Sequence, residues 1–423
     1  MSSISNSAVK FSSLGLRAKL PTIARLMSAA LENPSLLSLA AGFTDNGSLP
    51  LSCVNAAVEE IAQKDLKETL QYGSNQGRPR LRELLSEHLN QWEPELAVTP
   101  DSNSFFVTNG SQQAIYLAMQ VLCEPGDIVL VDRPSYFVFL EMLKAMGVRA
   151  VSIPVDENGF IDGAGLAALL NRFQATGDSV RIKAVYVVSY YSNPSSRCLN
   201  SEEKSALATV LLANGLIVPV IEDAAYRDLY FSEKPETKSM LGMKVWDNFP
   251  KLYLSTLTKP FATGLKVGYG FCTDSDWLAR MLHTKGHHDF GSANFCQAIL
   301  ERVIADGRFE RQLSVIRPMY GRKMCVLHET LLHEGLEELG WSWSKPEGGL
   351  YLWLKGPEAI DTSLESKFCR SCIAAGVLYV PGGLCFDDDG PSNYVRLSYG
   401  VLNEAELGEA GRRFVRVARE FVS

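Results

Sequence analysis

The middle of the chain alternates short apolar runs with longer stretches that carry apolar residues at helical spacing. The short runs are rich in β-branched residues: FFVTN (105–109), IVLVD (128–132), VRAVSIPV (148–155), KAVYVVSYY (183–191) and LIVPVIEDAAY (216–226). Nearly continuous apolar strands that alternate with helices predict a mainly parallel sheet covered by helices on both faces. Such sheets bind ligands beyond the carboxyl ends of their strands, so the polar residues at those ends are the candidates for function.

The first of these strands is followed by Asn109, Gly110, Ser111 and Gln112, which open the next predicted helix. Free N–H groups at a helix N-terminus, a glycine that permits close approach and a hydroxyl make a suitable phosphate site. Serine and asparagine also cap helices that bind nothing, so this fragment alone fits either interpretation.

Two further strand ends carry charged side chains. Glu222 and Asp223 end a very apolar run, and a carboxylate buried there needs a cationic partner unless it only caps the next helix. Lys259 follows the run KLYLSTLT; a lysine in a desolvated pocket is a nucleophile for carbonyl compounds, whereas a lysine that faces solvent is not. Together the three ends offer an anion site, a carboxylate and a reactive amine, which are the parts needed to hold pyridoxal phosphate (PLP).

A series of loose motifs runs in order along almost the whole chain: LAAG, QYGSNQGRPRLRELL, TNGSQQAI, DRPSY, YSNP, IEDAAY, TLTK, GLKVGY, EGGLYLW and YVRLSYG. This set resembles the fold type I, PLP-dependent aminotransferases of class I/II, particularly the aminoadipate and kynurenine aminotransferase branch. The resemblance implies an α/β fold with a mainly parallel sheet between helices and a smaller α+β domain. Residues 1–45 would form an N-terminal arm and the start of the small domain, 46–305 the large PLP-binding domain, and 306–423, with a long helix over 309–332, the C-terminal small domain.

The resemblance also implies a role for each matching residue. Lys259 would form the Schiff base and move the proton, Asp223 would pair with the pyridinium nitrogen, and Tyr226 would hydrogen-bond the ring's 3′ oxygen. Asn193 would share that contact, and Tyr136 would stack on the ring. The phosphate would be held by Gly110, Ser111, Gln112, Thr256, Thr258 and Lys266, with Tyr72 reaching it from the partner subunit. The substrate α-carboxylate would bind Arg396, with Gly42 and Asn193 nearby.

The chain departs from the family pattern at several of these positions. Lys266 stands where the family usually has arginine, so a bidentate phosphate contact becomes a point charge. Threonines occupy both hydroxyl positions before Lys259. Around Asn193 the chain has Ser189, Ser192 and Ser196 where the family tends to have proline, glutamine and glycine. The phosphate contacts and the wall that faces the substrate are therefore expected to differ from those of relatives.

These residues predict a transaminase that moves an amino group between an L-amino acid and a 2-oxo acid by a ping-pong cycle. The alternative is another fold type I enzyme such as a β-eliminating lyase or a synthase, because fold does not fix function. A DNA-binding regulator is disfavoured: 41 basic and 48 acidic residues give a net charge of −7, and the family match begins near residue 40. We expect a homodimer with shared active sites and neither a nucleic-acid nor a membrane partner.

Cysteine and histidine positions give weaker signals. Nine scattered cysteines without a secretory segment indicate reduced thiols and a cytoplasmic location, and Cys369 and Cys372 are expected in a buried helix. His283 and His287 lack a third ligand, so no metal site is predicted. Lys285, His287 and His288 could read an acidic substrate side chain or form a solvated loop. The basic first 31 residues fit an ordered arm better than a transit peptide.

Overall fold

A seven-stranded sheet forms the centre of the computed structural model, which describes residues 9–33, 35–40, 42–94, 96, 100–387 and 390–422. All neighbouring strands pair in parallel except β8, which runs antiparallel to both of its neighbours. The mainly parallel sheet is thus confirmed. In spatial order its strands are β2 (Phe105–Asn109), β8 (Val267–Cys272), β7 (Lys251–Thr256), β6 (Val220–Asp223), β5 (Ile182–Val188), β3 (Ile128–Val131) and β4 (Arg149–Ser152).

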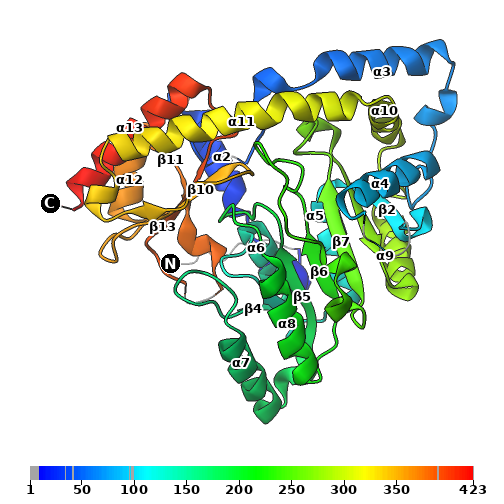
Figure 1. The fold of residues 1–423 in the computed structure, drawn as a ribbon, viewed down its shortest axis with the longest axis horizontal. Coiled ribbons are helices and arrows are strands. Elements are labelled where there is room, and N and C mark those ends of the chain that lie inside the picture. Colours follow the sequence, from blue (N-terminus) through cyan, green and yellow to red (C-terminus); the bar gives the residue numbers. More distant parts are fainter. Residues whose placement is uncertain are drawn as a thin grey trace.

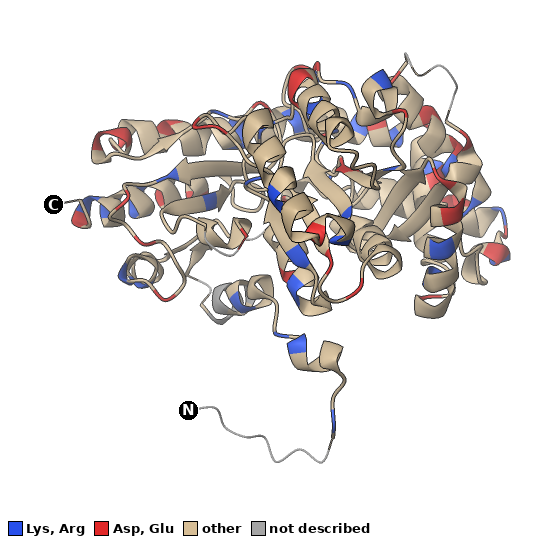
Figure 2. Ribbon diagram, turned by 90° about the horizontal axis from the view of Figure 1, so that it is seen from below, with Lys and Arg blue, Asp and Glu red and all other residues tan. Residues whose placement is uncertain are grey.

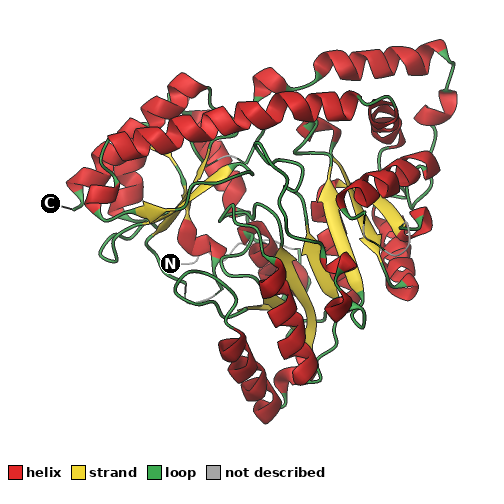
Figure 3. Ribbon diagram, in the orientation of Figure 1, coloured by secondary structure: helices red, strands yellow, loops and turns green. Residues whose placement is uncertain are grey.

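Helices cover both faces of this sheet, as Figure 3 shows. The side chains of β3 alternate between the two faces, because successive residues of a strand point in opposite directions. Val129 and Val131 pack with one group of helices, and Ile128 and Leu130 pack with the other. The first group is α5 (Gly110–Leu122), α6 (Phe137–Met146) and α9 (Ser275–His288), and the second is α7 (Gly163–Thr176) and α8 (Ser201–Ala213).

The C-terminal part of the chain forms a second, smaller sheet covered by helices. Its strands, in order, are β12 (Val380–Pro381), β13 (Tyr394–Ser398), β10 (Tyr351–Lys355) and β9 (Ser342–Trp343), all antiparallel. The predicted long helix is confirmed as α11 (Arg308–His333), which Figure 1 shows running across the top of the molecule to this part, where it packs on α13 (Glu404–Glu420).

Early residues join this C-terminal part. Strand β1 (Leu37–Ser38) pairs in parallel with β11 (Val377–Leu378). The next helices, α3 (Leu51–Gln63) and α4 (Pro79–Trp92), instead pack on α10 (Asn294–Ala305), beside the large sheet. This pairing agrees with a small domain made from both chain ends, while the boundaries at 45 and 305 stay predictions.

The structure describes the N-terminal arm from residue 9 onward, and the first eight residues lie outside the described part. The apolar stretch is divided into α1 (Ser13–Arg17) and α2 (Thr22–Glu32), because Pro21 lacks an N–H and disfavours helix in the residue before it. The Arg17 guanidinium donates hydrogen bonds to the carbonyl oxygens of Ala145 and Met146 at the end of α6. The arm therefore packs against a helix whose N-terminus lies at the site described below.

The remaining surface and thiol expectations can be placed on this fold. All nine cysteines are free, and Cys369 and Cys372 are buried in α12 (Lys367–Ala374), as predicted. His283, His287 and His288 lie on α9, the last two in its final turn. None of the described helices is long and apolar enough to cross a membrane. Figure 2 shows basic and acidic residues interspersed along the helices.

Candidate active site

A pocket of about 140 Å³ at the carboxyl ends of the large-sheet strands collects every predicted cofactor residue except Tyr72. Three further residues that were not predicted from the sequence also line the pocket, namely Tyr186, Val188 and Ala225. The predicted residues in its wall are Gly110, Ser111, Gln112, Tyr136, Asn193, Asp223, Tyr226, Thr256, Thr258, Lys259 and Lys266.

One end of the pocket is built to hold an anion. Helix α5 begins at Gly110, whose φ of +72° favours glycine, and its free N–H groups lie at this end. On the neighbouring β8, a Cβ on Gly268 would lie 2.4 Å from the backbone nitrogen of Ser111, so only glycine lets the helix start approach so closely. Lys266 Nζ lies 3.9 Å from where a Cβ on Gly110 would be. A lysine and a helix N-terminus thus converge on one point.

A carboxylate without a cationic partner lies at another wall of the pocket. Asp223 ends β6, and its two oxygens accept hydrogen bonds from the Tyr186 hydroxyl (2.9 Å) and the Ala225 backbone N–H (2.9 Å). Burial raises the pKa of Asp223 to about 6, although both hydrogen bonds oppose this shift. Within the described residues Asp223 forms no ion pair. Its chemistry therefore fits a ligand that brings a protonated ring nitrogen.

The amine predicted to react lies in the same pocket. Lys259 follows β7, and its Nζ donates a hydrogen bond to the backbone carbonyl oxygen of Gly42. Burial lowers the pKa of Lys259, the positive charges of Lys266 and Arg396 lower it further, and Tyr351 opposes them. A lowered pKa increases the fraction of neutral amine, which is the nucleophilic form.

A buried guanidinium marks the substrate end. Arg396 on β13 is 1% exposed and donates to Asn193 Oδ1 (2.8 Å) and to the Ala40 carbonyl oxygen (2.7 Å). Its Cζ lies 4.2 Å from the centroid of the Tyr351 ring and 5.4 Å from that of Phe137. Nε is buried without a hydrogen-bond partner, and the hydrogen bonds that Arg396 makes to described residues all go to uncharged groups. An incoming carboxylate would supply both missing interactions.

Two phenols meet beside this guanidinium. The hydroxyls of Tyr226 and Tyr351 lie 3.0 Å apart, and Tyr351 is fully buried on β10. The sequence reading included Tyr226 and missed Tyr351, although EGGLYLW was among the motifs. A Cβ on Gly42 would lie 2.9 Å from the Tyr351 hydroxyl, which explains why that position carries glycine.

Tyr72 does not reach the pocket of its own chain. It is 78% exposed and packs edge-on against Phe290, with the ring centroids 5.5 Å apart. Its expected contribution to a partner subunit's site stays a prediction.

Lys285 does not serve this pocket as a free cation. The side chain is buried, and its ammonium is held by Asp289 (3.0 Å) and the carbonyl oxygen of Asn75 (3.1 Å). Asp289 also accepts hydrogen bonds from Asn109 and Gln113 next to the start of α5. The possibility that Lys285 reads an acidic substrate side chain was therefore wrong, because its charge is already used to fix that helix.

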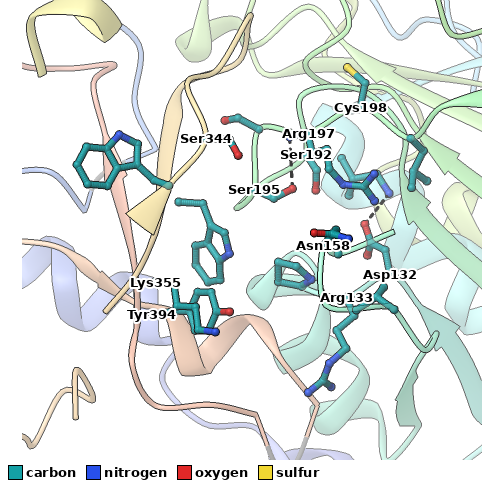
Figure 4. Close-up of a pocket in the computed structure, with 18 of the residues that line it drawn as sticks. Asp132, Arg133, Asn158, Ser192, Ser195, Arg197, Cys198, Ser344, Lys355 and Tyr394 are labelled. Carbon is teal, nitrogen blue, oxygen red and sulfur yellow. Dashed lines mark hydrogen bonds between the residues drawn. The ribbon is translucent and has the colours of Figure 1, made fainter. Parts of the chain in front are cut away.

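A larger cleft of about 920 Å³ adjoins the pocket through Val188, which lines both. Figure 4 shows Ser192, Ser195 and Arg197 on one side of it, facing Lys355 and Tyr394 of the small sheet. Two of the unusual serines differ in their contacts. Ser192 Oγ is buried without a partner in the described structure, whereas Ser196 Oγ donates to the Tyr351 carbonyl oxygen (2.7 Å).

Comparisons with known proteins agree with this geometry. Residues 34–414 match the family described as aminotransferase class I and II. The chain is 28% identical over 412 residues to aromatic-amino-acid aminotransferase 1 of Thermococcus litoralis, covering 97% of this chain and 94% of the relative.

Two solved structures share the fold over 97% of each chain. One is the kynurenine aminotransferase of Pyrococcus horikoshii, with a TM-score of 0.85 and 28% identity. The other is the α-aminoadipate aminotransferase of Thermus thermophilus complexed with N-(5′-phosphopyridoxyl)-L-leucine, with a TM-score of 0.82 and 25% identity.

The fold and the pocket together define a PLP-dependent enzyme of fold type I. The chain belongs to the aminotransferase class I and II family. It is a PLP-dependent transaminase of the branch that contains the aminoadipate and kynurenine enzymes, as predicted, and the lyase or synthase alternative is not favoured.

Proposed function

We propose that the enzyme transfers the amino group of an aromatic L-amino acid to a 2-oxo acid, with Arg396 binding the α-carboxylate and Lys259 moving the proton. The observation that carries this proposal is the unpaired Arg396 guanidinium, buried between two aromatic rings near the reactive lysine. A charge is costly to bury without a counter-ion, so the site gains stability when a carboxylate enters.

The pocket residues fit the cofactor at each of its polar groups. The start of α5 and Lys266 would hold the phosphate, and Asp223 would pair with the ring nitrogen. Tyr226 and Asn193 would donate to the 3′ oxygen, and Tyr136 would cover the ring. When bound, PLP supplies an electron sink for the carbanion formed at the substrate Cα.

The chain's own groups then position and move the proton. Asp223 would keep the positive charge on the ring nitrogen, because separating that pair would leave a buried carboxylate alone. Arg396 and Asn193 fix the carboxylate, which leaves the substrate Cα–H free to face Lys259. The Lys259 amine would take the proton from Cα as a general base and would return it, as a general acid, to the cofactor's C4′.

The aromatic donor is supported by the surroundings of Arg396. The rings of Phe137 and Tyr351 lie beside the Arg396 guanidinium, and Tyr136 lines the pocket, so the surroundings of the substrate end are rich in aromatic side chains. Lys285, one of the three residues considered as cations for a distal carboxylate, is paired with Asp289. The T. litoralis relative is named for aromatic substrates, and the P. horikoshii structure was solved with kynurenine.

A half-reaction assay tests the proposal. Adding phenylalanine or tyrosine alone to the holoenzyme should convert the cofactor to its amino form, and 2-oxoglutarate or pyruvate should then restore the starting absorbance. In steady state, kcat/KM for the aromatic donors should exceed the values for aspartate and 2-aminoadipate by at least about tenfold. Ammonia release without the amino form would contradict transamination, and a preference for acidic donors would contradict the aromatic specificity.

We also propose a homodimer in which Tyr72 completes the partner's site. Tyr72, Leu70 and Phe290 are each at least 66% exposed, and they lie close together. Exposed apolar patches of this kind mark interaction surfaces. The nine free cysteines support a cytoplasmic location, where thiols stay reduced.

Subunit complementation tests the shared site. Tyr72→Ala and Lys259→Ala subunits, each of low activity alone, are co-expressed with different tags so that the hybrid can be purified. One of the two sites in the hybrid would then carry both native residues, so up to about half of wild-type activity should return. If Tyr72 served its own chain, no site in the hybrid would be intact and activity would not return.

A further inference from the structure

We propose that Tyr351 is a positioning residue of the active site, whose hydroxyl donates to the Tyr226 oxygen and thereby holds Tyr226 as the donor to the cofactor's 3′ oxygen. This inference rests on the proposed role of Tyr226. It adds a residue from the small sheet, whose own side chain does not line the cofactor pocket, to the groups that set the charge on the ring.

The geometry of the two phenols supports a direct bond. Their oxygens are 3.0 Å apart, and their rings meet edge to face with centroids separated by 5.8 Å. Tyr351 is 1% exposed and Tyr226 is 7% exposed, so water competes little for this contact. A hydrogen bond in such surroundings is stronger than one at the surface.

Counting protons gives the bond its direction. Either phenol could be the donor when the pair is considered alone. Each phenol carries one proton, so Tyr226 cannot donate to Tyr351 while it donates to the cofactor. Burial and the Tyr351 hydroxyl hold the pKa of Tyr226 well above its usual range, so Tyr226 keeps its proton. Once PLP is bound, Tyr351 is therefore left as the donor within the pair.

Tyr351 is held in place from three sides. Its carbonyl oxygen accepts the Ser196 hydroxyl, its ring lies under the Arg396 guanidinium, and β10 fixes it opposite Ser398 of β13. Ser196 has a φ of +53°, a conformation that favours glycine, and its hydroxyl makes the bond that a glycine could not make. The phenol is thus oriented by the small sheet and by the loop that follows β5.

The expected consequence concerns the charge on the 3′ oxygen. A phenol that accepts a hydrogen bond becomes a better donor, because bonds in a chain polarise one another. A stronger bond from Tyr226 stabilises negative charge on the 3′ oxygen. The nitrogen that links Lys259 to the cofactor then holds its proton less tightly, so Tyr351 should lower the pH at which that nitrogen titrates.

The test is a pH titration of the resting holoenzyme's visible absorbance, without substrate. Tyr351→Phe removes the hydroxyl and keeps the ring, and it should raise the titration midpoint by about half to one pH unit. Tyr226→Phe should raise the midpoint by more. If Tyr351 acts through Tyr226, its substitution should cause no further shift in a Tyr226→Phe background.

Comparison of wild type, Tyr351→Phe, Tyr226→Phe and the double variant separates the inference from the function on which it rests. An unchanged midpoint in Tyr226→Phe would overturn the assigned role of Tyr226. If Tyr226→Phe shifts the midpoint and Tyr351→Phe does not, the role of Tyr351 alone is overturned. The same holds if Tyr351→Phe shifts the midpoint equally in the wild-type and in the Tyr226→Phe background.

A matched control variant shows whether the loss of any buried tyrosine hydroxyl would shift the titration midpoint. Tyr379→Phe removes another fully buried hydroxyl from the C-terminal part of the chain, one that donates to the Thr362 carbonyl oxygen (2.9 Å). It should lower Tm about as much as Tyr351→Phe and leave the midpoint unchanged. A midpoint shift in Tyr379→Phe equal to that in Tyr351→Phe would show that the effect is not specific to the pair, and would contradict the inference.

Discussion

Replacing Lys259 by alanine is expected to lower kcat by at least about 10⁴-fold while PLP binding is weakened but retained. The amine that reacts with the cofactor and moves the proton is lost, whereas the phosphate site at α5 and the carboxylate of Asp223 remain. Borohydride reduction followed by mass spectrometry should show PLP fixed to the wild-type chain and not to the variant.

Lys251 provides the matched control for this experiment. It begins the same strand β7 at the opposite end, donates to the Trp246 carbonyl oxygen, and has a pKa that burial likewise lowers. Lys251→Ala should keep both turnover and covalent labelling. Covalent labelling of the Lys259→Ala chain at wild-type levels would show that another lysine carries the cofactor and would overturn the assignment.

Asp223→Asn is expected to lower kcat by about 10²–10³-fold and to weaken PLP binding, because the charge that keeps the ring nitrogen protonated is removed. The amide can still accept from Tyr186 or from the Ala225 N–H, so the shape of the pocket is kept. Kinetics and PLP titration of the apoenzyme measure both effects. Unchanged kinetics would exclude pairing of Asp223 with the ring.

Although Asp223→Asn should lower activity and PLP binding, it should stabilise the apoenzyme at neutral to alkaline pH. The pKa of Asp223 is raised to about 6 in the folded chain, so the favourable contribution of this group is complete at acidic pH and is lost as pH rises through about 6. Apo Asp223→Asn should therefore have a Tm at or above wild type at pH 8, and this advantage should shrink as pH falls below 6.

Glu222→Gln is the contrasting neighbour. Glu222 pairs with the buried Lys204 (3.0 Å) and accepts from Ser239, so its substitution leaves a buried ammonium without its counter-ion. This should cost about 3–5 kcal/mol of stability at pH 8. The two adjacent carboxylates thus have different roles: Asp223 serves catalysis and Glu222 serves the stability of the fold.

The sequence predicted the parallel sheet because its strands are buried on both faces and read as continuous apolar runs. Glu222, Asp223 and Lys259 became candidates for the same reason, because each is a charge at the end of such a run or directly after it, and the family resemblance then distinguished Asp223 from Glu222. Tyr186 and Tyr351 were missed because each lies within an apolar strand. Which face of the sheet such a side chain occupies depends on the register of the strands. In the sequence, a tyrosine in the core and a tyrosine at the site therefore look alike.

Lys285 shows a different limit. Its neighbouring histidines suggested a solvated basic cluster, but its charge is balanced by Asp289, which lies four residues further on, directly after the end of α9. Neither the pairing of Lys285 with Asp289 nor the burial of this lysine was predicted, and its ammonium also donates to the carbonyl oxygen of Asn75, which is distant in sequence. Long-range contacts of this kind leave no local pattern.

Two backbone carbonyl groups near the N-terminal arm have a consequence for substitution tolerance. The oxygen of Ala40 accepts from Arg396, and that of Gly42 accepts from Lys259. Both contacts come from the main chain, so no side-chain change at these positions can remove them, and homologues can keep them without keeping the residue. A Cβ at position 42 would nevertheless lie 2.9 Å from the Tyr351 hydroxyl, so substitution there is restricted by steric overlap and not by loss of the hydrogen bond.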